Sequence, residues 1–115
     1  MENREIVKLI YKTLDEKKAS NVQVIDITGI SIMSDFFIVA SASNINHVHS
    51  LADYVEDELR KVGVHFNHME GFKSGNWILM DYGDVIVHIF DDSSRDFYDL
   101  EHIWNDGKKV DVELL

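Results

Sequence analysis

The chain has 115 residues, of which 45% are hydrophobic and 10% aromatic; this suits one folded domain and excludes a disordered chain. It contains no cysteine, which excludes a disulfide framework, thiol catalysis and cysteine-ligated metal centres. A formal net charge of −10 disfavours direct contact with nucleic acid or anionic membranes and favours a basic protein partner. The charged N-terminal residues, and the lack of any apolar run of about 20 residues, predict a cytoplasmic protein without a membrane span.

The first half of the chain predicts a helix, two strands and a second helix. Apolar residues recur every three to four positions from Ile6 to Leu14, as in an amphipathic helix. Strands are predicted over residues 22–27 and 36–41, and the apolar run of the second is typical of a strand covered on both faces. The cleanest helical stripe follows over residues 48–62, with Asn44 as its N-cap and Gly63 at its end.

The second half predicts three strands and a last helix. One strand is expected over residues 64–69 and a polar loop over 70–76. Residues 77–80 and 85–90 then pair as a hairpin whose apex, residues 81–84, is expected to be exposed, because Gly83 permits a tight turn. Ser93 or Ser94 is expected to cap a helix that runs through Trp104. The tail, about residues 106–115, is either loose or an added edge strand.

These elements together imply an α/β fold, a mixed sheet of about five strands flanked by helices, within a single domain over residues 1–115.

The sequence gives little support for a catalytic or metal site. The pairs His47/His49 and His65/His68 lack the i, i+4 spacing of a helical zinc site, so a structural role is favoured. The aspartates of the hairpin and its end suggest a Mg²⁺-dependent nucleotidyltransferase, but the required Gly-Ser turn before an Asp-x-Asp strand is missing. No metal and no cofactor is therefore predicted. Ser, His and Gly residues likewise match neither a hydrolase elbow nor a phosphate loop.

Large aromatic residues near the hairpin point to protein binding instead. Binding anchors are enriched in Trp, Tyr and Arg. Trp104 is expected to pack in the core, whereas Tyr82, flanked by Asp81 and Asp84 at a turn tip, is expected to anchor a partner.

Three blocks of residues in one order resemble the ribosomal silencing factor family, also called RsfS or Iojap. They are Asp26-Ile27-Thr28-Gly29 with Ser31 and Ser34-Asp35-Phe36-Phe37, Glu70-Gly71 with Trp77-Ile78-Leu79-Met80-Asp81-Tyr82-Gly83-Asp84-Val85 and His88, and Arg95 with Tyr98, Leu100-Glu101 and Trp104. One departure is the run from Asp91 to Ser94, where the family commonly carries a Glu shortly before the arginine of the last helix.

The resemblance implies a nucleotidyltransferase-like fold without the catalytic residues. The lack of an Arg-rich, transit-like leader favours a bacterial protein over an organellar one, so the bacterial cytoplasm is expected. The resemblance also implies binding to the large ribosomal subunit through its fourteenth protein, a block on subunit joining, repressed translation under nutrient limitation, and a homodimer. The partner-binding residues it implies are Trp77, Asp81, Tyr82, Asp84, Arg95, Tyr98 and Glu101. The alternatives that stay open are a catalytic nucleotidyltransferase-like enzyme and a homodimeric adaptor for another basic protein.

Overall fold

Two amphipathic helices form where the apolar periodicity predicts them. The computed structural model describes residues 1–30, 34–98 and 108–112, with the backbone alone for 96–98. Helix α1 (Asn3–Glu16) buries an apolar stripe that includes Ile10 and Leu14. Helix α2 (Ile45–Lys61) is capped by Asn44, whose side-chain oxygen accepts a hydrogen bond from the His47 amide at 2.8 Å. The predicted N-cap is therefore confirmed.

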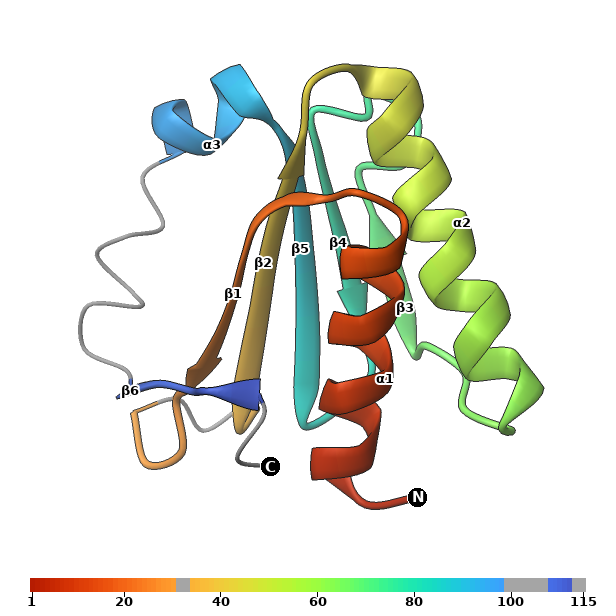
Figure 1. Ribbon diagram of the computed structural model, residues 1–115, viewed down its shortest axis with the longest axis vertical. Helices are drawn as coiled ribbons and strands as arrows, with labels where there is room; N and C mark the ends of the chain where they lie inside the picture. Colours follow the sequence, from red (N-terminus) through yellow and green to blue (C-terminus); the bar gives the residue numbers. More distant parts are fainter. Residues whose placement is uncertain (31–33, 99–107, 113–115) are drawn as a thin grey trace.

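Six strands form one mixed sheet in the order β3-β4-β5-β2-β1-β6 (Figure 1). Strands β2 and β5 run parallel at its centre, and all other neighbours are antiparallel. The strands are β1 (Ser20–Asp26), β2 (Phe36–Ala42), β3 (His68–Glu70), β4 (Trp77–Asp81), β5 (Val85–Asp91) and β6 (Lys108–Lys109). The predicted α/β class with a mixed sheet is confirmed.

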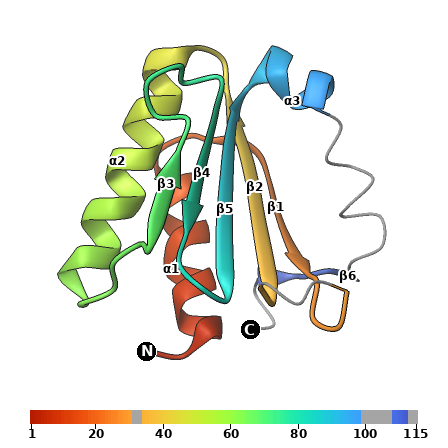
Figure 2. The same ribbon diagram turned by 180° about the vertical axis from the view of Figure 1, so that it is seen from behind.

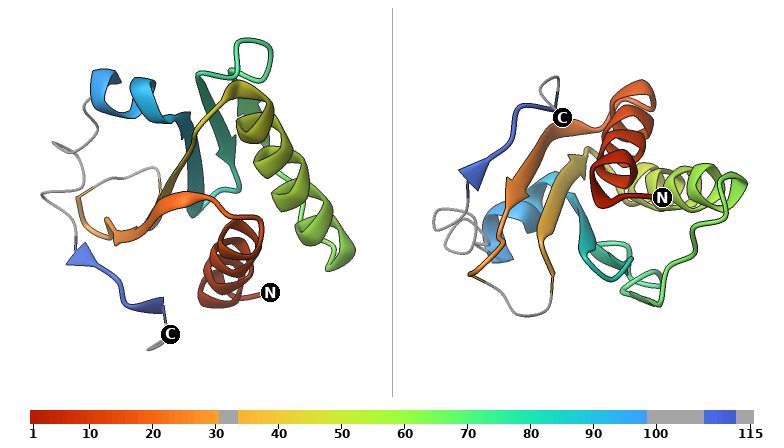
Figure 3. Two further views of the ribbon diagram at one scale, coloured as in Figure 1. Left: turned by 45° about the horizontal axis from the view of Figure 1, so that its top comes forward. Right: turned by 90° about the horizontal axis from the view of Figure 1, so that it is seen from below.

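The two faces of the sheet are packed differently. Helices α1 and α2 cover the same face, as Figure 3 shows, and alternate strand residues such as Ile38, Met80 and Val87 meet them in the main core. On the opposite face, Ile25, Ile27, Val39 and Phe90 form a smaller buried cluster against which Phe37 and Trp77 pack. This second face holds the side chains of β4 that point away from the helices.

One predicted strand boundary was wrong, and one alternative for the tail is confirmed. The strand expected over residues 64–69 begins only at His68, because the chain leaving α2 makes a turn in which the Val64 amide donates to the Leu59 carbonyl at 2.9 Å. The edge strand that the sequence allowed for the tail is confirmed, because Lys108 and Lys109 pair with β1 and form a sixth strand of the sheet. The Val110 amide then donates a hydrogen bond to the Val24 carbonyl at 2.8 Å.

The last helix begins earlier than predicted. Helix α3 (Asp92–Tyr98) follows directly on β5, at the end of the sheet that is uppermost in Figure 1 and that Figure 2 shows from behind. The cap is neither Ser93 nor Ser94, because the Asp91 carboxylate accepts the Ser94 amide hydrogen bond at 2.9 Å. An aspartate before the helix satisfies a free amide of the first turn as well as a serine does. The predicted extension through Trp104 lies outside the described residues.

Candidate protein-docking face

Strand β4 places Trp77, Leu79 and Asp81 on the face of the sheet opposite α1 and α2. Side chains alternate along a strand, so these three residues point the same way while Ile78 and Met80 enter the main core. All three are partly exposed. Trp77 and Asp81 are about 13 Å apart, from the usual rise of a strand. The sequence placed Asp81, Tyr82 and Asp84 at the hairpin apex, and Trp77 lies at the other end of β4.

Trp77 is held by two aromatic neighbours, His88 and Phe90. Its indole Nε1 donates a hydrogen bond to Nδ1 of His88 at 3.0 Å. Its ring stacks on Phe90, with 5.2 Å between centroids and 24° between planes. The cross-strand register explains both contacts, since Phe90 lies directly opposite Trp77 on β5 and His88 lies on the diagonal.

His88 is buried beneath this indole. It is 4% exposed, and burial alone lowers its pKa from 6.5 to about 4, because the charged imidazolium loses its hydration. The rings of His88 and Phe37 form an edge-to-face pair, at 4.9 Å between centroids and 76° between planes. Its Nε2 has no hydrogen-bond partner among the described residues. His88 is therefore neutral near pH 7, with a role that the sequence did not reveal.

Gly71 brings a loop against the backbone of Trp77. Gly71 has a φ of +81°, and a Cβ added there would lie 1.9 Å from the Trp77 carbonyl oxygen. Only glycine tolerates both the left-handed backbone and this approach. Together with Glu70 and Leu79, the two residues line a surface hollow of about 240 Å³ beside the indole. The partly exposed ring of Trp77 forms one wall of this hollow.

The hairpin apex is only partly exposed. The Tyr82 amide donates to the Val85 carbonyl at 2.9 Å, and the Gly83 amide donates to Asp81 Oδ1 at 2.7 Å. Gly83 has a φ of +88°, so the predicted tight turn on this glycine is confirmed. Asp84 is exposed and accepts a hydrogen bond from the side chain of Asn3 at 3.1 Å.

The expected exposure of Tyr82 was wrong. Its ring packs against the main core and against Phe66, at 6.3 Å between centroids. Its hydroxyl oxygen is buried and has no hydrogen-bond partner among the described residues. Burial, and to a smaller extent the charge of Glu56, raises the pKa of Tyr82. The side chain turned inward because the turn places it on the helix-covered face, and an aromatic ring gains more from burial than from water.

Arg95 ties α3 to the sheet. Its Nη1 donates to the Asn21 carbonyl at 2.7 Å and to the Ser41 hydroxyl at 3.2 Å. Asn21 lies at an irregularity of β1, with a φ of 49°. Arg95 therefore shapes this end of the sheet. Tyr98 ends α3 and its side chain is not described, and Glu101 and Trp104 lie outside the described residues.

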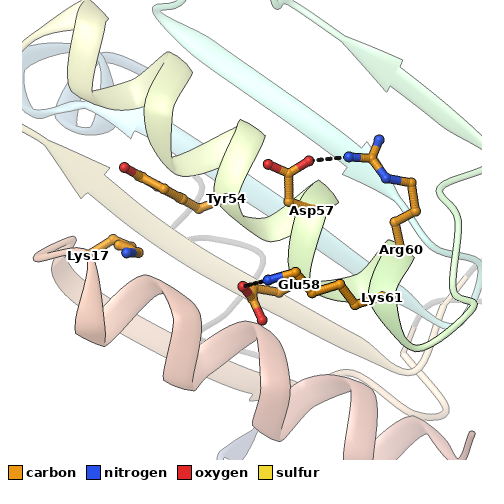
Figure 4. Close-up of a pocket in the computed structure, with 6 residues that line it drawn as sticks. All are labelled: Lys17, Tyr54, Asp57, Glu58, Arg60 and Lys61. Carbon is orange, nitrogen blue, oxygen red and sulfur yellow. Dashed lines mark hydrogen bonds and ion pairs between the residues drawn. The ribbon is translucent and has the colours of Figure 1, made fainter.

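A second hollow lies between the end of α1 and the last turns of α2 (Figure 4) and has a volume of about 450 Å³. Its charges are engaged with one another. Arg60 pairs with Asp57, and Lys61 Nζ lies 2.9 Å from a Glu58 oxygen, which lowers the pKa of Glu58. Lys17 Nζ stands 4.3 Å from the centre of the Tyr54 ring. This hollow is a solvated ion-pair surface.

Three of the other described histidines make polar contacts within the fold. His47 Nε2 bonds to the Lys17 carbonyl at 2.8 Å, His49 bonds to the Phe72 carbonyl, and His68 pairs with Glu70 at 2.9 Å. Across the described residues, no three His, Cys, Asp or Glu side chains gather as metal ligands would. No helix in the same part of the chain is long and apolar enough to cross a bilayer.

Comparisons with known proteins agree on one family. The model of the family described as "Ribosomal silencing factor during starvation" matches residues 1–115. A protein of Halalkalibacterium halodurans named ribosomal silencing factor RsfS is similar to this chain, with 33% identity over 98% of this chain and 97% of the relative. A protein of the same name in Bacillus subtilis is 32% identical over 99% of this chain and 97% of the relative. A crystal structure of a Chromobacterium violaceum protein is similar with a TM-score of 0.88, at 35% identity over 96% of this chain and 92% of that chain.

Proposed function

The chain belongs to the ribosomal silencing factor family, and from that premise we propose that it binds the large ribosomal subunit through the subunit's fourteenth protein and blocks joining of the small subunit. Translation is thereby repressed when nutrients are limited. The mechanism is steric: the bound protein occupies surface that the small subunit needs, so no chemical step is required. Its potency depends on affinity and on the number of copies.

The observation that carries the proposal is the row of Trp77, Leu79 and Asp81 on β4. It combines a partly exposed tryptophan, an apolar side chain and a carboxylate on one face of a rigid strand, and Asp84 adds an exposed carboxylate beyond its end. Aromatic anchors beside charges that match the partner are typical of protein interfaces. A net charge of −10 favours a basic ribosomal protein over ribosomal RNA as the contact.

The proposed interface uses the seven residues that the family resemblance implies. Trp77 and Asp81 contact the partner from β4, and Asp84 attracts its cations from the end of the hairpin. Tyr82 supports the apex from inside. Arg95 fixes the start of α3. Tyr98 and Glu101 belong to the proposed interface through the resemblance alone. An interface of the usual size, about 1,600 Å² in total, is within the reach of such a face.

Sedimentation tests the proposal directly. The purified protein is centrifuged with isolated large subunits and, separately, with isolated small subunits at two salt concentrations. We expect comigration with large subunits alone, weaker at the higher salt because acidic and basic surfaces are screened. Comigration with neither subunit refutes the proposal. Capture of a basic protein without any ribosomal protein would favour the adaptor, and Mg²⁺-dependent nucleotide turnover that is lost on changing Asp81 would favour the enzyme.

Two substitutions test the face itself. Trp77→Ala should weaken binding to large subunits by about 2 kcal/mol or more, as expected for a central aromatic. Asp84→Lys should lower mainly the association rate, since it reverses a charge that steers the encounter. Asp53→Lys is the matched control, because it makes the same charge change at an exposed position on α2. Equal effects of the two lysine variants would show that net charge alone matters and that the β4 face is not the interface.

A further inference from the structure

We propose that His88 is a positioning residue for docking: it accepts the indole hydrogen bond of Trp77 and holds the ring so that Trp77 offers the partner carbon surface and no hydrogen-bond donor. The inference rests on the proposed function, in which Trp77 contacts a basic protein of the large subunit. It adds a residue that itself touches no partner, since His88 is 4% exposed.

The geometry around the indole fixes its orientation. The Nε1 to Nδ1 distance of 3.0 Å is that of a good hydrogen bond, so the polar edge of Trp77 faces inward. Phe90 stacks against one face of the indole at 5.2 Å. A tryptophan held by one hydrogen bond and one stacked ring loses little conformational freedom when a partner arrives, which favours tight binding.

A buried histidine at this position lowers the stability of the fold, so its presence calls for a compensating function. To accept from the indole, Nδ1 must be unprotonated, so the proton of the neutral ring is on Nε2. That N–H is buried and meets no acceptor among the described residues. A buried donor without an acceptor is unfavourable, and an apolar residue would fill the space at lower cost. The bond to Trp77 is the one benefit of the imidazole that these contacts show.

The outward side of the indole fits a cationic side chain with an apolar stem. Trp77 and Leu79 provide apolar walls in the hollow of about 240 Å³, and the acidic residue Glu70 also lines it. Lysine and arginine side chains bind in this way, with the stem on apolar surface and the charge near a ring or a carboxylate. A basic partner would supply such a side chain, and the inward-turned N–H would not repel its charge.

The first test needs no ribosome. In nuclear magnetic resonance spectra of the full chain, the Trp77 indole proton is distinguished from that of Trp104 by its loss in Trp77→Phe. We expect this proton to exchange slowly with solvent and the His88 ring to carry its proton on Nε2 at pH 7. His88→Phe, which keeps a buried ring but removes the acceptor, should make the indole proton exchange faster. His88→Asn should restore protection, because its side-chain oxygen stands close to the position of Nδ1.

The second test measures binding to isolated large subunits. His88→Phe should weaken binding about tenfold, His88→Asn should stay within about threefold of the unaltered protein, and His65→Phe, at an exposed histidine, should have no effect. Because His88 acts through Trp77, His88→Phe should cause no further loss in a Trp77→Phe background. Circular dichroism and thermal melting verify that each variant is folded.

Several results would overturn the inference: a His88 proton on Nδ1, an indole proton that exchanges as fast in the unaltered protein as in His88→Phe, normal binding by His88→Phe, or losses from the two substitutions that simply add. The proposed function and the positioning role of His88 can be refuted independently of each other. If the unaltered protein does not bind large subunits, the proposed function fails, while the exchange and tautomer measurements still judge the hydrogen bond. If it binds but His88→Phe binds equally well, only the positioning role fails.

Discussion

Acid should destabilise this protein through His88 in particular. Burial lowers the pKa of His88 from 6.5 to about 4 in the folded chain, whereas the unfolded chain exposes an ordinary imidazole. Between these two values the unfolded state binds more protons, so the free energy of unfolding falls as the pH falls. The contribution is fully present above pH 6.5 and is lost on the way down to about pH 4.

The size of this effect follows from the shift. Each pKa unit is worth about 1.4 kcal/mol, so the difference between the two states corresponds to a loss of about 3 kcal/mol over that range. A domain of this size has about 5–15 kcal/mol of total stability, so the loss is measurable. Protonation of His88 would also remove the acceptor for the Trp77 indole, since both nitrogens of an imidazolium are donors.

Urea unfolding at several pH values between 7 and 4.5 measures the effect. His88→Phe lacks the titrating group, so its free energy of unfolding should fall less steeply than that of the unaltered protein over this range. His65→Phe is the control at an exposed histidine and should follow the unaltered protein. Parallel curves for the unaltered protein and His88→Phe, or a direct titration of His88 near 6.5, would refute the argument.

Three further substitutions test single contacts by thermal or urea unfolding. Gly71→Ala should cost about 2 kcal/mol or more, because it adds a clash with the Trp77 carbonyl to the left-handed backbone, whereas Gly63→Ala, with a φ of +80° and open space around it, should cost only about 1 kcal/mol. Equal costs would exclude the clash. Tyr82→Phe removes a buried hydroxyl without a partner among the described residues and should leave stability unchanged or raise it by up to about 1 kcal/mol, so a clear loss would reveal a bond to that oxygen. Asn44→Ala should cost about 1 kcal/mol through the lost cap on α2, and an unchanged melting temperature would contradict that role.

The sequence alone determined the elements whose signals are local. The stripes of α1 and α2 repeat at the helical period and report which face is buried, whatever the stripe packs against. Asn44 caps α2 through its own side chain and Gly83 turns the chain through its own backbone. Both act on near neighbours in the sequence, so the cap and the turn were predictable. The mixed α/β class followed from the order of these elements, and the resemblance to one family followed from motifs in three blocks.

Tertiary structure alone decided which side chains meet. Whether Tyr82 points outward or inward depends on which face of the sheet α2 covers. The sequence around the turn is compatible with both orientations. The pairing of Trp77 with His88 depends on the register of β4 and β5, where a slip of one residue would turn either side chain to the other face. Arg95 reaches Asn21 and Ser41 from 74 and 54 residues away along the chain. Contacts at such separations leave no local pattern in the sequence, because they form only when the whole sheet has assembled.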